Sequence, residues 1–161
     1  MVTTLIVIPL IASGLIQKPV DHTRDLDFWV GEWECVFESR DAQGSWVKSP
    51  CRNSIRKEFG GGMISEHFTM GSYRGMSVNA YDRKLLKWRQ TWVDGGSNYV
   101  LLEGGKEGDR FVFRTPKGQE PESRITYFDI QKDQMEWMTE RKGKDGAWTT
   151  VLKMHYKRAK T

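Results

Sequence analysis

The sequence predicts an all-β fold in which about ten consecutive antiparallel strands close into an up-and-down barrel. Turn clusters rich in Gly, Asp and Pro interrupt the chain at short intervals, and the runs between them are rich in Val, Ile, Thr and aromatic residues. Such runs are typical of short antiparallel strands. No segment has the periodicity of a crossover helix, so the strands follow one another as a meander. So long a meander closes, because an open sheet would leave two unpaired edges.

The composition narrows the function classes. The 161 residues fit one domain, which we expect at 18–161. A net charge of +4 and 12% aromatic residues exclude a disordered chain. The basic residues are scattered among acids, so no nucleic-acid partner is expected. The three histidines lie far apart and no Cys-x-x-Cys occurs, which predicts no metal site.

The N-terminal segment is apolar. No charged side chain precedes Lys18, and the apolar run 5–11 ends in the small residues of 12–14. We expect 1–17 to be a secretory signal peptide, so that the protein is secreted or periplasmic. The alternative is an apolar tail on a cytoplasmic protein. Because the run is too short to cross a bilayer, no integral membrane span is expected.

Each element can be placed in order along the chain. A short helical turn is expected at 23–28, where Thr23 would act as the N-cap before an acidic first turn. Strands follow at 29–38, 45–59, 63–70, 74–81, 86–93, 98–103, 110–114, 124–130, 134–141 and 148–158.

Alternation of residue type along each strand predicts which side chains face the interior. In the first strand Trp33 lies on the apolar face, opposite three glutamates. In the second strand Asn53 shares its face with apolar residues, Phe59 included. The third strand places Glu66 on its more apolar face, where a carboxylate must be paired or protonated. The alternatives are that Glu66 pairs with an arginine, or that Met63 and His67 form the buried face.

Two later strands complete the assignment. The fifth places Gln90 between Trp88 and Trp92 on one face, as a polar group within an aromatic wall. In the last strand the residues 148, 150, 152, 154 and 156 share the inward face, so His155 should face solvent.

The two cysteines lie on the first two strands. A loop at 41–44 places Cys35 and Cys51 nearly opposite each other on the inward face. In an exported protein they can form a disulfide. The alternative is a pair of buried, reduced thiols.

Several motifs resemble a bacterial family of single-domain proteins without an assigned function. They are LDFWVGEWE at 26–34, FGGGMI at 59–64, YRGM at 73–76, AYD at 80–82 and WVD at 92–94. The resemblance implies a calycin-like barrel, similar to nitrobindins, lipocalins and fatty-acid-binding proteins. The Gly-x-Trp element at Gly31 and Trp33 is also similar to the lipocalin signature. Nitrobindins hold haem through a histidine near the C-terminal strand, where His155 lies, but haem binding would need a bulge to turn this side chain inward.

These features predict a lipocalin-like barrel that binds a small hydrophobic or aromatic ligand without a cofactor. The expected ligand-binding residues are Trp33, Asn53, Glu66, Trp88, Gln90 and Trp92. One alternative is a cofactor-free isomerase, cyclase or lyase in which Glu66 acts as acid or base. A second is a haem-binding, nitrobindin-like protein. A third is that the indoles simply fill the core. The oligomeric state stays open, a homodimer included.

Overall fold

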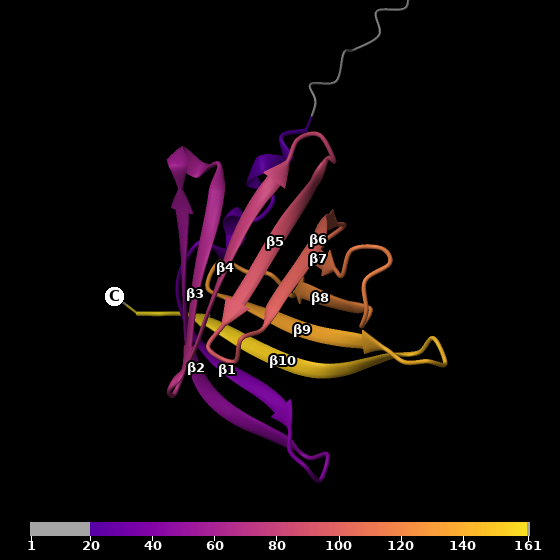
Figure 1. Ribbon diagram of the computed structural model, residues 1–161. Coiled ribbons are helices and arrows are strands. Elements are labelled where there is room, and N and C mark those ends of the chain that lie inside the picture. The colour runs from indigo at the N-terminus through magenta and orange to yellow at the C-terminus, as the bar shows by residue number, and fades with distance from the viewer. Residues whose placement is uncertain (1–19, 161) are drawn as a thin grey trace, which may run out of the picture.

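Ten antiparallel strands form one closed barrel in the computed structural model, which describes residues 20–160 (Figure 1). The predicted signal peptide or tail at 1–17 lies outside the described residues. Each strand pairs with its neighbours in sequence, and β1 pairs with β10 to close the sheet. The predicted all-β, calycin-like barrel is therefore confirmed. The strands are β1 Gly31–Arg40, β2 Trp46–Glu58, β3 Met63–Met70, β4 Tyr73–Asp82, β5 Lys87–Asp94, β6 Tyr99–Glu107, β7 Arg110–Arg114, β8 Ser123–Phe128, β9 Gln134–Lys142 and β10 Trp148–Arg158.

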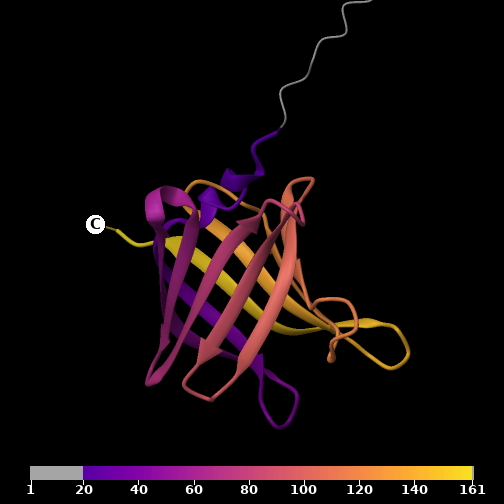
Figure 2. The ribbon, with the colours of Figure 1, turned by 45° about the horizontal axis from the view of Figure 1, so that its top comes forward.

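The N-terminal helical region consists of two short 3-10 turns, η1 (His22–Arg24) and η2 (Asp27–Trp29). The predicted N-cap is wrong: Asp21 caps η1, because its carboxylate accepts hydrogen bonds from the backbone N–H and the hydroxyl of Thr23, at 3.1 and 2.6 Å. Figure 2 shows these turns at one end of the barrel, while the β1–β2 and β9–β10 hairpin loops extend away from it. We call this the plugged end, since Leu26 and Trp29 are fully buried there.

Trp33 and Arg158 fasten the plug to the barrel. The Trp33 indole donates a hydrogen bond to the carbonyl of Trp29 at 2.7 Å. The Arg158 guanidinium lies 4.1 Å above the Trp33 ring and donates to the carbonyl of Val30 at 3.0 Å. Gly31 has a φ of +136°, and a Cβ there would lie 2.2 Å from Nη1 of Arg158. The Gly-x-Trp element therefore needs its glycine for both backbone conformation and space.

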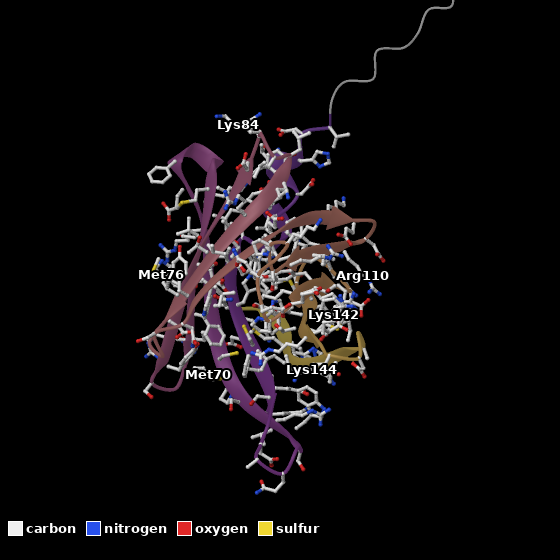
Figure 3. The ribbon with its side chains drawn as sticks, turned by 45° about the vertical axis from the view of Figure 1, so that its right-hand side comes forward. Met70, Met76, Lys84, Arg110, Lys142 and Lys144 are labelled. Carbon is white, nitrogen blue, oxygen red and sulfur yellow. The ribbon has the colours of Figure 1, made fainter. Side chains whose placement is uncertain are left out.

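The opposite end, which we call the mouth, has apolar side chains on its inner rim that are half-buried. Figure 3 shows Lys84 at the plugged end and Met70 toward the mouth. The mouth residues are Phe37, Met70, Tyr73, Trp92 and Ile125.

Two expected face assignments are wrong. The register of β10 against β9 shifts between Thr150 and Leu152, so a β-bulge separates two parts of the strand. Leu152, Met154 and Tyr156 continue the inward face, but Trp148 and Thr150 pair with outward-facing residues of β9. Phe59 is not in β2, which ends one residue earlier. It begins the 3-10 turn η3 (Phe59–Gly61) and is 87% exposed.

Candidate ligand-binding site in the barrel interior

A buried carboxylate lies on the inner face of the barrel wall. Glu66 of β3 is 6% exposed. Its Oε1 accepts a hydrogen bond from Nδ2 of Asn53 on β2 at 2.7 Å, and its Oε2 accepts one from the hydroxyl of Ser77 on β4 at 2.6 Å. Within residues 20–160 no lysine, arginine or histidine forms an ion pair with it.

Hydrogen bonds extend from Glu66 in both directions around the barrel. On one side Nδ2 of Asn53 also donates to the Tyr156 hydroxyl at 3.1 Å. On the other, Asn79 donates to Oγ of Ser77 at 2.8 Å, and Gln90 donates to Oδ1 of Asn79 at 2.8 Å. We call the six side chains the polar network: Asn53, Glu66, Ser77, Asn79, Gln90 and Tyr156.

The strand register accounts for this grouping. Glu66 lies opposite Ser77 in the β3–β4 pair, and Asn79 lies opposite Gln90 in the β4–β5 pair. Residues two apart on a strand share a face, so Ser77 and Asn79 both face inward. Three predicted site residues, Asn53, Glu66 and Gln90, are thus brought together, and their inward orientation is confirmed by their burial.

Burial governs the acidity of this site. It raises the pKa of Glu66 to about 7, although the hydrogen bonds from Ser77 and Asn53 act in the opposite direction. Burial likewise raises the pKa values of Tyr127 and Tyr156.

The alternative in which Glu66 pairs with an arginine is wrong, as is the one that buries His67, which is exposed.

The network has one clear orphan. Oδ1 of Asn53 is buried and has no hydrogen-bond partner within the described residues. A buried acceptor without a donor is costly, by about 1–3 kcal/mol. The site therefore offers a free acceptor directly beside the Glu66 carboxylate.

Aromatic side chains line much of the remaining interior. Phe111, Phe113 and Tyr127 from β7 and β8 are buried and pack against one another and against the plug. The polar network on β2–β5 and β10 and this aromatic group on β7 and β8 give the interior a polar and an apolar side. That arrangement suits a mostly apolar molecule with one polar group.

The three predicted tryptophans do not form one wall. Trp33 and Trp88 are buried toward the plugged end, where each indole N–H donates to a carbonyl of the plug. Trp92 is half-buried at the mouth, 6.1 Å from the ring of Phe68, and donates to Asp94 at 2.9 Å. Trp33 and Trp88 therefore hold the plug in place, and of these three tryptophans only Trp92 lies at the mouth.

Cys35 and Cys51 are direct cross-strand partners of β1 and β2, as predicted, and both are buried, free thiols. The hydrogen bond with Cys51, together with burial, raises the pKa of Cys35. A disulfide between them stays a prediction.

The histidines do not fit a haem inside the barrel. His155 is exposed, and its Nδ1 lies 2.5 Å from the Glu136 carboxylate on the outer face, so its predicted orientation is confirmed. His22 and His67 are exposed as well. Over residues 20–160 no cluster of three or more His, Cys, Asp or Glu side chains could hold a metal ion.

The clefts found at the surface lie away from the polar network. One of about 570 Å³ is bordered by β6, β7 and the loop after β7. Its charged side chains are largely committed to ion pairs, such as Lys87 with Glu103 and Arg114 with Glu107. A second, of about 370 Å³, lies beside the turn between β8 and β9. Neither contains a predicted site residue.

Sequence reasoning did not single out Ser77, Asn79 or Tyr156. On β4 the apolar residues Met76, Val78 and Ala80 face outward, so alternation there gives no sign of an inward polar face. Tyr156 was placed inward, but its contact with Asn53 depends on closure of the barrel between β1 and β10.

Helices long and apolar enough to cross a membrane are not found among residues 20–160.

Comparisons with known proteins show the fold. The chain matches no family model and no curated protein. It is similar in structure to Rv2717c from M. tuberculosis, with a TM-score of 0.62 and 9% sequence identity over 89% of this chain and 100% of the other. It is also similar to the S-type phycobiliprotein lyase CpeS from Guillardia theta, with a TM-score of 0.55 and 13% identity over 84% of this chain and 91% of the other.

Proposed function

We propose that this protein binds a small, mostly apolar or aromatic molecule inside its barrel, with the polar network holding the polar group of that molecule. The observation that carries the proposal is the buried, hydrogen-bonded Glu66, which has no cationic partner in the described part of the chain, next to the unpaired acceptor of Asn53. A barrel that needed only a core would fill these positions with apolar residues, since buried polar groups cost stability. A ligand-binding role explains why they are polar.

The mouth provides the route of entry. Its half-buried apolar side chains surround the end of the barrel opposite the turns η1 and η2. Trp92 belongs to this rim and packs against Phe68, which lies two residues beyond Glu66 on β3, so an apolar body would contact these rings first. One structural neighbour is named a phycobiliprotein lyase, which agrees with a chemical role for such a barrel.

Tryptophan fluorescence tests the proposal. The purified protein is titrated with a long-chain fatty acid, a retinoid and a series of phenolic and naphthyl compounds, because Trp92 at the mouth reports on contact with a ligand. We expect saturable binding of at least one compound, and weaker binding by the Gln90→Leu variant. The control Gln43→Leu makes the same change in an exposed loop and should bind as the unaltered protein does. A protein that binds none of these compounds would overturn the proposal.

A second function is favoured by the acidity of Glu66. A carboxyl group whose pKa lies at about 7 exchanges its proton readily at neutral pH, as a general acid or base must. In that case the protein is a cofactor-free isomerase, cyclase or lyase. Turnover of a bound compound should then fall by about 100-fold or more in Glu66→Gln. Unchanged turnover in that variant would exclude the role.

We also propose that the segment 1–17 directs export, so that the barrel works outside the cytoplasm. Intact-mass measurement of protein recovered from the periplasm or medium of an expressing bacterium tests this. Export predicts a mature chain lacking the segment, whereas full-length protein confined to the cytoplasm would refute it.

A further inference from the structure

We propose that the ligand is a cation, a protonated amine or a related N–H cation on an apolar or aromatic body, whose positive nitrogen binds between Glu66 and the free oxygen of Asn53. This inference rests on the proposed function and adds the chemical class of the ligand. It follows from the charge of the site, its hydrogen-bonding capacity and the rings around it.

The charge at the site has only one possible sign. Glu66 is buried among neutral hydrogen-bonding groups from β2 and β4. The other titratable groups coupled to it are Tyr156 of β10, Tyr127 of β8 and Cys35 of β1. All three are acids that are neutral when protonated and negative when ionised, so none of them can neutralise a carboxylate. A buried carboxylate without a cation is unfavourable, and a cationic ligand would remove that penalty.

The hydrogen-bonding capacity also favours a donor. Nδ2 of Asn53 already donates to Glu66 and Tyr156, Nδ2 of Asn79 donates to Ser77 and the Ile64 carbonyl, and the Ser77 hydroxyl donates to Glu66. The Asn53 oxygen, in contrast, accepts no hydrogen bond from residues 20–160. Each carboxylate oxygen of Glu66 accepts one hydrogen bond from a side chain and can accept another. An ammonium group carries up to three donors and no acceptor, which matches this surplus.

Aromatic rings lie between the network and the mouth. Phe68 is the cross-strand partner of Asn53 and follows Glu66 by two positions on the same face. Its ring packs 6.1 Å from that of Trp92 and 6.2 Å from that of Tyr73. Ring faces attract cations, and they also cover the apolar body that carries the charge. No lysine or arginine is buried among residues 20–160, so an anionic ligand would meet Glu66 without a cation to neutralise it.

The proposal predicts a pH dependence of a particular sign. A bound cation favours the ionised form of Glu66, so binding near neutral pH should release protons. Affinity for an amine should therefore rise as the pH increases from 5 to 8, while affinity for an uncharged analogue should not rise. The tyrosines coupled to Glu66 have pKa values raised by burial and stay protonated in this range.

Four naphthalene derivatives of similar size provide the test: 2-(aminomethyl)naphthalene, 2-naphthalenemethanol, 2-methylnaphthalene and 2-naphthoic acid. Binding is measured by calorimetry at pH 7.5 in two buffers with different enthalpies of ionisation, which also counts released protons. We expect the amine to bind about 10- to 100-fold more tightly than the alcohol, as a charged hydrogen bond implies. The carboxylate should bind most weakly.

Two variants locate the effect. Glu66→Gln keeps the shape of the side chain and should remove both the preference for the amine over the alcohol and the proton release. Glu34→Gln makes the same change of net charge on the exposed outer face of β1 and should keep the preference. Circular dichroism shows that each variant is folded.

The outcomes separate this inference from the proposed function. Equal binding of the amine and the alcohol, or the same preference for the amine in Glu66→Gln, would overturn the cation assignment and leave a ligand-binding barrel. If none of the four compounds bound, the cation assignment would fall, and failure of the wider fluorescence series would then overturn the proposed function as well.

Discussion

Replacement of Glu66 by glutamine should change how the stability of the fold depends on pH. The pKa of Glu66 is raised to about 7 in the folded protein by burial, against an ordinary value of 4.5 that applies in the unfolded chain. The folded state therefore binds this proton more tightly than the unfolded state does. Its contribution to stability is present in full below the unfolded pKa and is lost as the pH rises through the folded one. The difference between the folded and unfolded pKa values of Glu66 corresponds to about 3 kcal/mol in the free energy of unfolding.

Urea unfolding measured between pH 4.5 and 8.5 checks this value. As the pH rises from 4.5 to 8.5, the free energy of unfolding of the unaltered protein should fall by about 3 kcal/mol more than that of Glu66→Gln. All other titrating groups are shared by the two proteins, so they cancel in the difference. A constant offset is expected too, because glutamine rearranges the hydrogen bonds to Asn53 and Ser77, but an offset does not depend on pH. Glu34→Gln should follow the unaltered protein. Parallel curves for the unaltered protein and Glu66→Gln would refute the assignment of a buried, uncompensated carboxylate.

Three further predictions concern the fold. Arg158→Ala should destabilise the protein by about 1–3 kcal/mol, because it removes the stacking on Trp33 and the hydrogen bond to the Val30 carbonyl. In urea titration this effect should be well above that of Arg141→Ala, a change at an exposed residue. Gly75→Ala should lower the free energy of unfolding by about 1–3 kcal/mol, because its Cβ would lie 2.2 Å from the Trp92 ring. The control Gly105→Ala, with open space around it, should have a far smaller effect. Equal urea unfolding midpoints for the two variants would contradict the packing argument. Both cysteines should react with a thiol reagent only after denaturation, since they are 5% and 6% exposed, and rapid labelling of the folded protein would count against this burial.

Alternation of residue type predicted much of the fold and part of the site. It placed Glu66 and Asn53 correctly because the neighbours of each on the same face are apolar, and because the β2 and β3 register is regular. The ranges 63–70, 110–114 and 148–158 agree with β3, β7 and β10. These strands have turn signals at both ends.

The failures have physical causes of their own. The bulge between Thr150 and Leu152 reverses the face of the strand without a sequence signal as distinct as a glycine or proline. Outward apolar residues on β4 conceal its inward Ser77 and Asn79, since a strand that is apolar on its outer face shows no useful alternation. The role of Arg158 depends on contact between the two ends of the chain, which local patterns do not describe.

Closure through β1 and β10 has a consequence for how the protein is made. Trp33 pairs with Arg158 in the seam, so the plug and the last residues of the final strand secure each other. During synthesis the first strand emerges long before its partner and must wait for nearly the whole polypeptide. Contacts so distant along the chain form slowly, because the intervening segment must first lose much of its conformational freedom. A nascent chain that ended before β10 would lack this seam, and β1 and β9 would be left as unpaired sheet edges.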